Sequence, residues 1–369
     1  MTSVTIEPEK FSDQSVHSLR PEDRVEKVRL SICIATYNRA KFIGETIDSI
    51  LNQMESGVEL LIVDGASPDN TDEIVSRYVE SNSNIRYIRE NVNSGIDGDY
   101  DKAVLYANGE YCWLMTDDDL LKPGAIRAVI DAINDSHDLV ILNSEVWNTD
   151  YSTLLTPRFA TVNVDREYSA KDIDGLFVDA AGTLSFIGCV VIRRSLWLSR
   201  LRVPYYGTLF VHFGVIFQPP VLDSVLLIAD PLISIRYGNA MWTPRGFEIW
   251  MIKWPQLIWS FTHIAELSKL VVSAPEPWRQ FRKLLLYRAI GGYGLEEYRK
   301  FLEAKALGFS KVLPLFVAAI PAGLANAMAS IYCLLFARRA RTNVYDLARS
   351  VNSTWAARTA AHMLGISRK

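Results

Sequence analysis

The sequence YCWLMTDDD at residues 111–119 decides the predicted fold, because an apolar, strand-like run ends there in three consecutive carboxylates. Asp is a poor strand residue, and adjacent like charges repel each other. A hard divalent cation among the oxygens would relieve that repulsion, since Mg²⁺ and Mn²⁺ prefer carboxylate and phosphate ligands. The alternative is a solvated turn in which Asp119 caps a helix that begins near Pro123. Because the cluster follows a buried strand, we expect a ligand site at the carboxyl edge of an α/β sheet.

The rest of the first half alternates between strand-like and helical patterns. Runs rich in β-branched and other apolar residues are separated by segments whose apolar residues recur at helical spacing. This alternation predicts a mostly parallel sheet with right-handed crossovers and helices on its faces. Neither a G-x-G-x-x-G motif after the first strand nor a P-loop motif occurs, which excludes those two nucleotide-binding classes. The predicted strands, apart from residues 111–115, are at residues 28–36, 58–64, 85–88, 139–142, 161–164 and 185–192.

Composition narrows the classes of function. The chain has 369 residues, of which 49% are hydrophobic and 22% charged, as in a globular protein of one large or two ordinary domains. Its net charge of −3 argues against a nucleic-acid binder, which would carry a basic excess. The four cysteines lack metal-site spacing, so we expect a reducing compartment, and the chain opens without a secretory signal pattern.

Four motifs resemble those of the family 2 glycosyltransferases of the GT-A fold. They are SICIATYNR at 31–39, IVDGASPDNT at 62–71, NSG at 93–95, and GEY at 109–111 leading into TDDD at 116–119. Each motif is common alone, but their order and spacing over residues 28–135 are specific to that family. The full layout looks most like the abequosyltransferase-type enzymes of O-antigen assembly. The resemblance implies a Rossmann-like α/β fold with flanking helices. Residues from 246 onward are rich in Trp, Leu and Arg and predict an additional C-terminal helical region.

The resemblance also implies a binding site for a nucleotide-diphospho-sugar across the carboxyl ends of the strands. Tyr37 would offer an aromatic face to the nucleoside, or it would simply cover the core. Arg39 would place a charge near the phosphates or the base. Asp64 would accept hydrogen bonds from the base or ribose, or it would cap the helix that follows. The nucleotide-sugar-binding residues implied in this way are Thr36, Tyr37, Asn38, Arg39, Asp64, Asn93, Gly95 and Asp117.

The three aspartates receive different roles from the resemblance. Asp118 aligns with the metal-binding carboxylate of the family, and Asp117 with its neighbour near the ribose. Asp119 would hydrogen-bond a metal-bound water and act in catalysis, or it would cap the next helix. The implied cofactor is Mg²⁺ or Mn²⁺, which would bridge both phosphates and neutralise charge on the departing nucleoside diphosphate.

The chain departs from the family pattern at several positions. Gly65 stands where many members have a second carboxylate, and Thr116 stands where many begin the acidic motif with Asp. The later acidic pair that supplies the catalytic base is missing. His212 lies in the expected neighbourhood and could take a proton from an acceptor hydroxyl, or it could be a hydrogen-bonded core histidine. Asp179 and Asp223 are weaker candidates for the base.

Residues 312–336 contain no charged residue and are long enough to cross a bilayer, but two prolines, a glycine and Asn326 interrupt them. The segment could be membrane-embedded, an interfacial helix pair, or a buried helix. Arg338, Arg339 and Arg341 would favour anionic headgroups, so we expect peripheral attachment to the cytoplasmic face of the cell membrane. The Trp-rich residues 242–259 would suit either an interface or core packing.

Taken together, the sequence predicts a metal-dependent glycosyltransferase. It would move a hexosyl or deoxyhexosyl group from a nucleotide sugar to a hydroxyl of a polysaccharide or of an acceptor carried on a polyprenyl diphosphate. The alternative is a catalytically degenerate scaffold subunit, which the missing acidic pair motivates. A processive synthase is disfavoured, because its Q-x-x-R-W motif and several convincing spans are absent. Homo-oligomerisation stays open. The expected regions are a tail (1–27), a catalytic domain (28–245, divided into a donor half at 28–142 and an acceptor half at 143–245) and a helical region (246–369).

Overall fold

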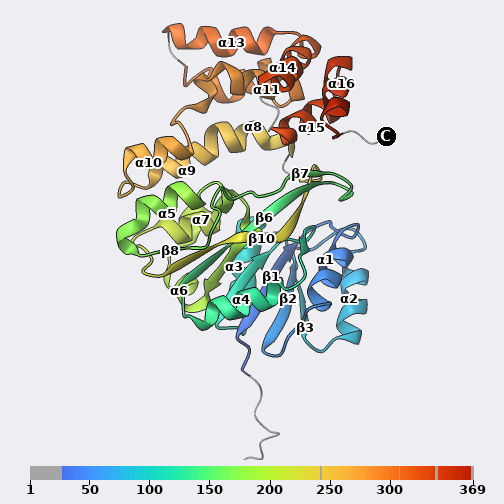
Figure 1. Cartoon of the computed structure of the whole chain (residues 1–369), viewed down its shortest axis with the longest axis vertical. Coiled ribbons are helices and arrows are strands. Elements are labelled where there is room, and N and C mark those ends of the chain that lie inside the picture. Colours follow the sequence, from blue (N-terminus) through green and yellow to red (C-terminus); the bar gives the residue numbers. More distant parts are fainter. Residues whose placement is uncertain (1–26, 242, 307, 337–339, 367–369) are drawn as a thin grey trace, which may run out of the picture.

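The computed structural model describes residues 27–241, 243–306, 308–336 and 340–366. It consists of a mixed α/β part and a helical part, which lie one above the other along the longest axis of the molecule (Figure 1). The expected N-terminal tail falls outside the described residues except for Lys27.

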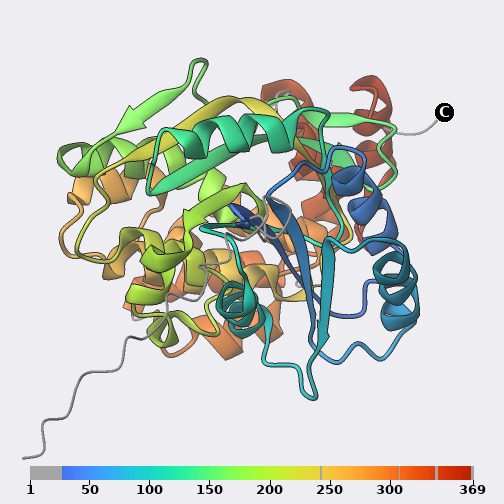
Figure 2. The same cartoon turned by 90° about the horizontal axis from the view of Figure 1, so that it is seen from below.

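The first half of the sheet forms as the sequence predicts. Strands β1, β2 and β4 are buried at every position, as expected for strands covered on both faces. β1 pairs in parallel with β2 and β4, and β2 pairs in parallel with β3. Helices flank the sheet on both sides (Figure 2). The elements are β1 (Leu30–Thr36), α1 (Ile43–Leu51), β2 (Val58–Asp64), α2 (Thr71–Ser81), β3 (Ile85–Arg89), α3 (Ile96–Tyr106) and β4 (Tyr111–Met115).

The second half extends the same sheet, in the order β3-β2-β1-β4-β9-β6-β10-β5. β9 is antiparallel to both of its neighbours, whereas β10 returns parallel to β6. The predicted mostly parallel α/β sheet with flanking helices is thereby confirmed. The elements are β5 (Leu120–Leu121), α4 (Ala125–Asn134), β6 (Leu139–Asn148), β7 (Leu154–Thr156), β8 (Arg166–Tyr168), α5 (Ile173–Ala180), β9 (Val190–Arg193), α6 (Arg194–Ser199), α7 (Val211–Phe217) and β10 (Val225–Tyr237).

Two strand predictions in this half are wrong. Residues 161–164 form no strand, and residues 185–189 form short 3₁₀ turns that precede β9. A short apolar run cannot distinguish a buried strand from a buried turn. Here the side chain of Trp113 donates from Nε1 to the carbonyl of Gly188 at 2.8 Å, so that carbonyl bonds to a side chain and not to a strand ladder.

The described residues from 243 onward form only helices and turns. Trp254 is buried and packs edge-on against Phe210 and Phe213, so this part of the Trp-rich segment belongs to the core; Trp242 lies outside the described residues. The principal elements are α8 (Gly246–Glu248), a π-helical turn (Ile249–Lys253), α9 (Trp254–Ser260), α10 (Glu266–Val272), α11 (Phe281–Ile290), α12 (Leu295–Glu297), α13 (Val312–Ala319), α14 (Ala322–Phe336), α15 (Arg341–Arg349) and α16 (Trp355–Met363).

The uncharged segment 312–336 forms two helices and not one. α13 and α14 meet at an angle of 103° across the break at residues 320–321, where Pro321 cannot donate a helical hydrogen bond. Among the described helices, none is by itself both long and apolar enough to cross a bilayer. Within the part of the chain that the structure describes, α13 and α14 taken together form the one bent pair that could cross, on length and composition alone.

Candidate active site

The register of the parallel strands brings the predicted motifs to one edge of the sheet. Thr36 at the end of β1 lies opposite Asp64 at the end of β2, and Asp64 lies opposite Arg89 at the end of β3. β4 pairs with β1 so that Met115 lies opposite Ile34, which delivers the three aspartates to the same edge. This is the edge at which open α/β sheets bind ligands.

Asp64 organises the loop after β2. Its side chain is fully buried and accepts hydrogen bonds from the backbone nitrogen of Ser67 (2.8 Å) and from the hydroxyl of Tyr87 (2.7 Å). It does not cap α2, because the backbone nitrogen of Thr71 bonds to Asp69. Both oxygens of Asp64 therefore already have partners within the chain, and its contact with a base or ribose stays a prediction.

The loop after β1 is tied to the same structure. Asn38 has a φ of 58°, a left-handed conformation that Asn tolerates better than most residues, and its backbone nitrogen bonds to the Ser67 hydroxyl at 2.9 Å. Asn38 is exposed, whereas Tyr37 is half-buried. The backbone nitrogen of Ala40 donates to Asp69 at 2.9 Å. The two loops thus hold each other in place beside the acidic cluster.

Asn93 and Gly95 are exposed on the loop that leads into α3. Gly95 has a φ of 80°, and its nitrogen donates to the Asn93 side chain at 2.7 Å. A Cβ at position 65 would lie 2.7 Å from a carboxylate oxygen of Asp99, which is too close, and at an ordinary contact distance of 3.5 Å from Asn93. A second carboxylate after Asp64 would therefore require the side chain of Asp99, which bonds to the Ser94 hydroxyl, to move.

At the centre of the site, the guanidinium of Arg39 forms ion pairs with two carboxylates, those of Asp117 and Asp118. Asp117 and Asp118 each expose only 9% of their surface. Arg39 approaches Asp117 through Nε at 3.4 Å and Asp118 through Nη2 at 3.3 Å. Asn239 donates to Asp118 at 2.9 Å, while its own carbonyl accepts from Arg39 at 3.2 Å. The predicted residues Arg39, Asp117 and Asp118 are therefore brought into contact, and Asn239 joins them.

Burial and mutual repulsion set the charge of this pair. Burial, followed by the charge of Asp118, raises the pKa of Asp117 to about 7, while Arg39 opposes the shift. Burial also raises the pKa of Asp118, against the opposing effects of Arg39 and Asn239. A further cation, or a bound ligand that donates hydrogen bonds, would stabilise the charged form of these two buried carboxylates.

The carboxylate of Asp119 bonds to β10 and to Thr116, and not to the start of the next helix. It is 2% exposed, and its carboxylate accepts from the Arg236 backbone nitrogen at 2.6 Å and from the Thr116 hydroxyl. α4 begins after Gly124 without any side-chain cap, so the capping interpretation is wrong. Asp119 instead anchors the turn after β4 to β10. Its predicted catalytic role, through a metal-bound water, stays untested, although the chain already uses both of its oxygens.

Arg236 is a residue of this site that the sequence analysis did not single out. It is 7% exposed and donates from Nε to the Asp118 carbonyl at 2.9 Å, from Nη1 to the Thr149 carbonyl at 2.9 Å, and from Nη2 to Glu45. Its guanidinium also lies over the Tyr151 ring, 4.4 Å from the centroid. The sequence feature that could have identified it is a charged arginine within an otherwise apolar run, which forms the end of β10.

The donor chemistry of the site fits the predicted metal. Among the described residues, no group of three or more His, Cys, Asp or Glu side chains forms a ready-made metal site. Magnesium, however, is often held by only one or two carboxylates together with substrate phosphates. The adjacent hard oxygens of Asp117 and Asp118 match that pattern, with the remaining ligands left to a bound diphosphate.

His212 lies in the core of the acceptor half. It is 1% exposed, its Nε2 is 2.7 Å from the Leu184 carbonyl, and its Nδ1 has no hydrogen-bond partner among the described residues. Burial lowers the pKa of His212 to about 4. This geometry favours the core-histidine interpretation over the predicted base, although the role itself is untested.

Two other carboxylates, one in each half of the catalytic domain, also bond to groups within the chain. Asp97 accepts from the backbone nitrogens of Gly207, Leu209 and Val211, so it ties α3 to the loop before α7. Asp179, one of the weaker candidates for the base, accepts from Arg166 at 2.6 Å.

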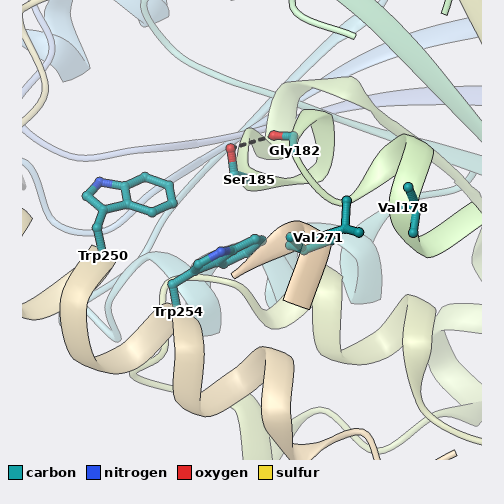
Figure 3. A pocket seen from close by; sticks show the side chains of 7 residues that line it. Val178, Gly182, Ser185, Trp250, Trp254 and Val271 are labelled. Atoms are coloured by element: carbon teal, nitrogen blue, oxygen red, sulfur yellow. Dashed lines mark hydrogen bonds between the residues drawn. The ribbon is translucent and has the colours of Figure 1, made fainter. Parts of the chain in front are cut away.

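Two hollows lie outside this acidic edge. One, of about 240 Å³, is lined by Trp250 and Trp254 on one side and by Val178 and Ser185 on the other (Figure 3); the Ser185 hydroxyl donates to the Gly182 carbonyl at 2.7 Å. The other, of about 520 Å³, lies between the β6–β7 turn and α15–α16. Neither is lined by Asp117 or Asp118.

Comparisons with known proteins agree with the fold and the motifs. Residues 31–196 match the family model described as glycosyl transferase family 2. Abequosyltransferase RfbV of Salmonella typhimurium is 26% identical over 230 residues, which cover 59% of this chain and 69% of that protein. The GalNAc(5)-diNAcBac-PP-undecaprenol β-1,3-glucosyltransferase of Campylobacter jejuni is 28% identical over 147 residues, 40% of this chain and less than half (44%) of that enzyme.

Among solved structures, S. aureus TarS (residues 1–349) in complex with UDP superimposes with a TM-score of 0.52 at 15% identity. The match covers 92% of this chain and 93% of the TarS chain, so the similarity of fold includes the helical part.

Proposed function

We propose that this chain, whose residues 31–196 match the glycosyl transferase family 2 model, transfers a sugar from a nucleotide-diphospho-sugar to a hydroxyl of a growing cell-surface glycan. The transferred group is a hexosyl or deoxyhexosyl unit. The acceptor is an oligosaccharide carried on a polyprenyl diphosphate, or a polysaccharide. The single observation that carries the proposal is the buried Asp117–Asp118 pair, held by Arg39 at the carboxyl edge of the parallel strands.

Different residues of the chain have different roles in binding the donor. Arg39 and the Asn239 amide hold the two carboxylates in place before the donor arrives. A diphosphate brought to this pair meets the Arg39 guanidinium, whose planar fork suits phosphate oxygens. Arg236 and Asp119 fix the turn that carries the pair, so the carboxylates need little reorganisation when the donor binds.

Asp118, assisted by Asp117, would hold the Mg²⁺ or Mn²⁺ ion. Such an ion would supply positive charge beside the two phosphates and so make the nucleoside diphosphate a better leaving group.

The names of the relatives support the acceptor class. RfbV is named an abequosyltransferase, and the Campylobacter jejuni relative is named for a glycan on PP-undecaprenol. A polyprenyl diphosphate carrier resides in a membrane, which agrees with a protein attached to the cytoplasmic face.

The test combines donor binding with one substitution. Nucleotide sugars are screened for thermal stabilisation with and without Mn²⁺, because a ligand that binds only the folded state raises the apparent melting temperature. Asp118→Ala should remove the manganese-dependent part of the shift and lower transfer by at least about 100-fold. Its melting temperature without ligand should stay near that of the wild type, because the substitution also relieves repulsion from Asp117.

The matched control is Asp131→Ala, which removes an exposed aspartate of α4 that pairs with Arg127. Retained transfer by Asp118→Ala would overturn the metal-binding assignment. A wild-type protein that binds a nucleotide sugar without transferring or hydrolysing it would favour a scaffold function.

A further inference from the structure

Helices α13 and α14 expose an unusual amount of apolar surface. These 23 residues carry nine of the 27 exposed large hydrophobic residues found among the described part of the chain. Both helices lie in the helical part, at the end of the molecule away from the sheet (Figure 1). We call the nine residues the C-terminal apolar face: Val312, Leu315, Phe316, Leu324, Met328, Ile331, Tyr332, Leu335 and Phe336.

The orientation of α14 is set by its opposite side. Asn326 is fully buried and accepts from the Thr354 backbone nitrogen at 3.0 Å and from the Thr354 hydroxyl at 2.7 Å, while it donates to the Leu347 carbonyl at 3.0 Å. Small residues such as Ala325 and Ala329 pack beside it. Because α15 and α16 occupy this side, the row at 324, 328, 331 and 335 is held outward at helical spacing.

Basic residues outnumber acidic ones in the sequence of the C-terminal helices. From residue 306 to residue 369 the sequence contains eight Lys or Arg and a single acidic residue, Asp346. Asp346 faces inward, where it accepts from the Tyr237 hydroxyl at 2.8 Å. At the border of the face, the guanidinium of Arg282 lies 5.3 Å from the centre of the Tyr332 ring. Basic groups beside apolar side chains match the headgroups and acyl boundary of an anionic lipid surface.

The dimensions argue for a helix pair that lies on the bilayer. The hydrocarbon core is about 30 Å thick and needs about 20 helical residues to cross it. α14 has 15 residues and α13 has 8, and they turn by 103° between them. A buried, fully bonded Asn326 also commits one side of α14 to protein and not to lipid.

We propose that the C-terminal apolar face docks the protein onto the interface of a bilayer that contains anionic lipid. The apolar side chains enter the acyl boundary, and basic groups beside the face, such as Arg282 and Lys311, contact the headgroups. Since α15 contacts the sheet beside the active site, docking would also hold the acidic edge at a set position relative to the membrane. The proposal concerns binding to lipid and stands or falls independently of the transfer reaction.

The test uses the purified full-length protein and flotation with vesicles. Vesicles of equal parts phosphatidylglycerol and phosphatidylethanolamine should bind the protein at least about tenfold more strongly than vesicles of phosphatidylcholine, because several cations contribute. Binding should weaken in high salt, which screens the charges. Equal binding to both kinds of vesicle, or none to either, would overturn the proposal.

The variant Ile331→Glu/Leu335→Glu removes two apolar contacts and adds two anions. Both positions are more than half exposed, at 52% and 58%, so the folded protein should tolerate the change. Vesicle binding should fall by at least about 100-fold, given the transfer free energy of two such side chains. The matched control is Leu105→Glu/Val164→Glu, at 55% and 66% exposure in the α/β part, and it should bind as the wild type does.

Two further measurements distinguish interfacial docking from the two alternatives, a membrane span and a dimer formed through this face. Alkaline carbonate should release the wild-type protein from vesicles, whereas resistance to extraction would show a membrane span and overturn an interfacial position. Light scattering should give the same mass for the wild type and for Ile331→Glu/Leu335→Glu. A dimer that only the wild type forms, without vesicle binding, would assign the face to a second copy of the chain.

Discussion

At the scale of single residues, His212 shows how position limits chemistry. Its Nε2 lies 2.7 Å from the Leu184 carbonyl, a contact that requires this nitrogen to carry the proton and donate. Burial keeps the ring neutral and lowers its pKa to about 4. A general base works best with a pKa near the operating pH and in contact with the acceptor hydroxyl, whereas His212 has a lowered pKa and exposes only 1% of its surface.

We therefore expect His212→Gln to change the transfer rate by less than about tenfold, while it lowers the free energy of unfolding by about 1–3 kcal/mol. Glutamine can still donate to the Leu184 carbonyl, but it packs differently in the core. Initial rates and chemical denaturation measure the two effects. His263→Gln, at an exposed position, is the control and should change neither. A loss of about 10²–10⁴ in rate with an unchanged melting temperature would restore His212 as the base.

The position of Asp119 likewise limits what this charged residue can do. Three consecutive aspartates look equivalent along the sequence, yet Asp119 is turned toward the Arg236 backbone while Asp117 and Asp118 face Arg39. The difference arises because β10 lies beside the turn after β4, a contact between residues more than a hundred positions apart.

At the scale of elements, α14 combines an apolar composition with one buried amide. Asn326 bonds to Leu347 of α15 and to Thr354 directly before α16, so it joins three helices through a single side chain. In a soluble core, a buried amide is tolerated only when its donors and acceptors are paired. The residue that interrupts the hydrophobic run in the sequence is thus the residue that holds the C-terminal helices together.

Asn326→Ala should lower the free energy of unfolding by about 2–4 kcal/mol, because the Thr354 nitrogen and the Leu347 carbonyl lose their partner in a buried position. Denaturant titration followed by tryptophan fluorescence measures this loss. Asn163→Ala, at an exposed loop position, serves as the control and should lie within about 0.5 kcal/mol of the wild type. An Asn326→Ala variant as stable as that control would contradict the structural role.

At the scale of the whole molecule, the helical part is joined to the sheet beside the active site. Val146 and Leu155 of the sheet share a hydrophobic cluster with Tyr345 and with residues of α11, α14 and α16. The Tyr345 hydroxyl also lies 3.1 Å from that of Thr149, whose carbonyl bonds to Arg236. A truncation would expose this cluster, so substitutions on the outer surface are the better way to separate docking from folding.

This arrangement predicts that docking affects the acceptor and not the donor. Ile331→Glu/Leu335→Glu should hydrolyse the donor in the absence of acceptor at the wild-type rate, because its acidic edge is unchanged. Incorporation of radiolabelled sugar into the lipid extract of membrane vesicles should fall by at least about tenfold, as less enzyme reaches the acceptor. An equal loss in both assays would show that the substitution damages the active site.

The sequence by itself determined the α/β sheet, its strand-end motifs and the acidic pair. These features are local: apolar runs of strand length, helical spacing between them, and polar residues where each strand stops. Parallel strands share a carboxyl edge, so the convergence of Arg39, Asp117 and Asp118 followed without coordinates.

Only the tertiary structure decided the partners of these residues. Arg236 and Asn239 join the site from β10 and the loop after it, and His212 enters the core, through contacts that no local pattern encodes. The same holds for residues 312–336. Their composition suited a membrane span, an interfacial pair and a buried helix equally. The break at Pro321 and the bonds of Asn326 are what turn one side of α14 toward protein and leave the other exposed.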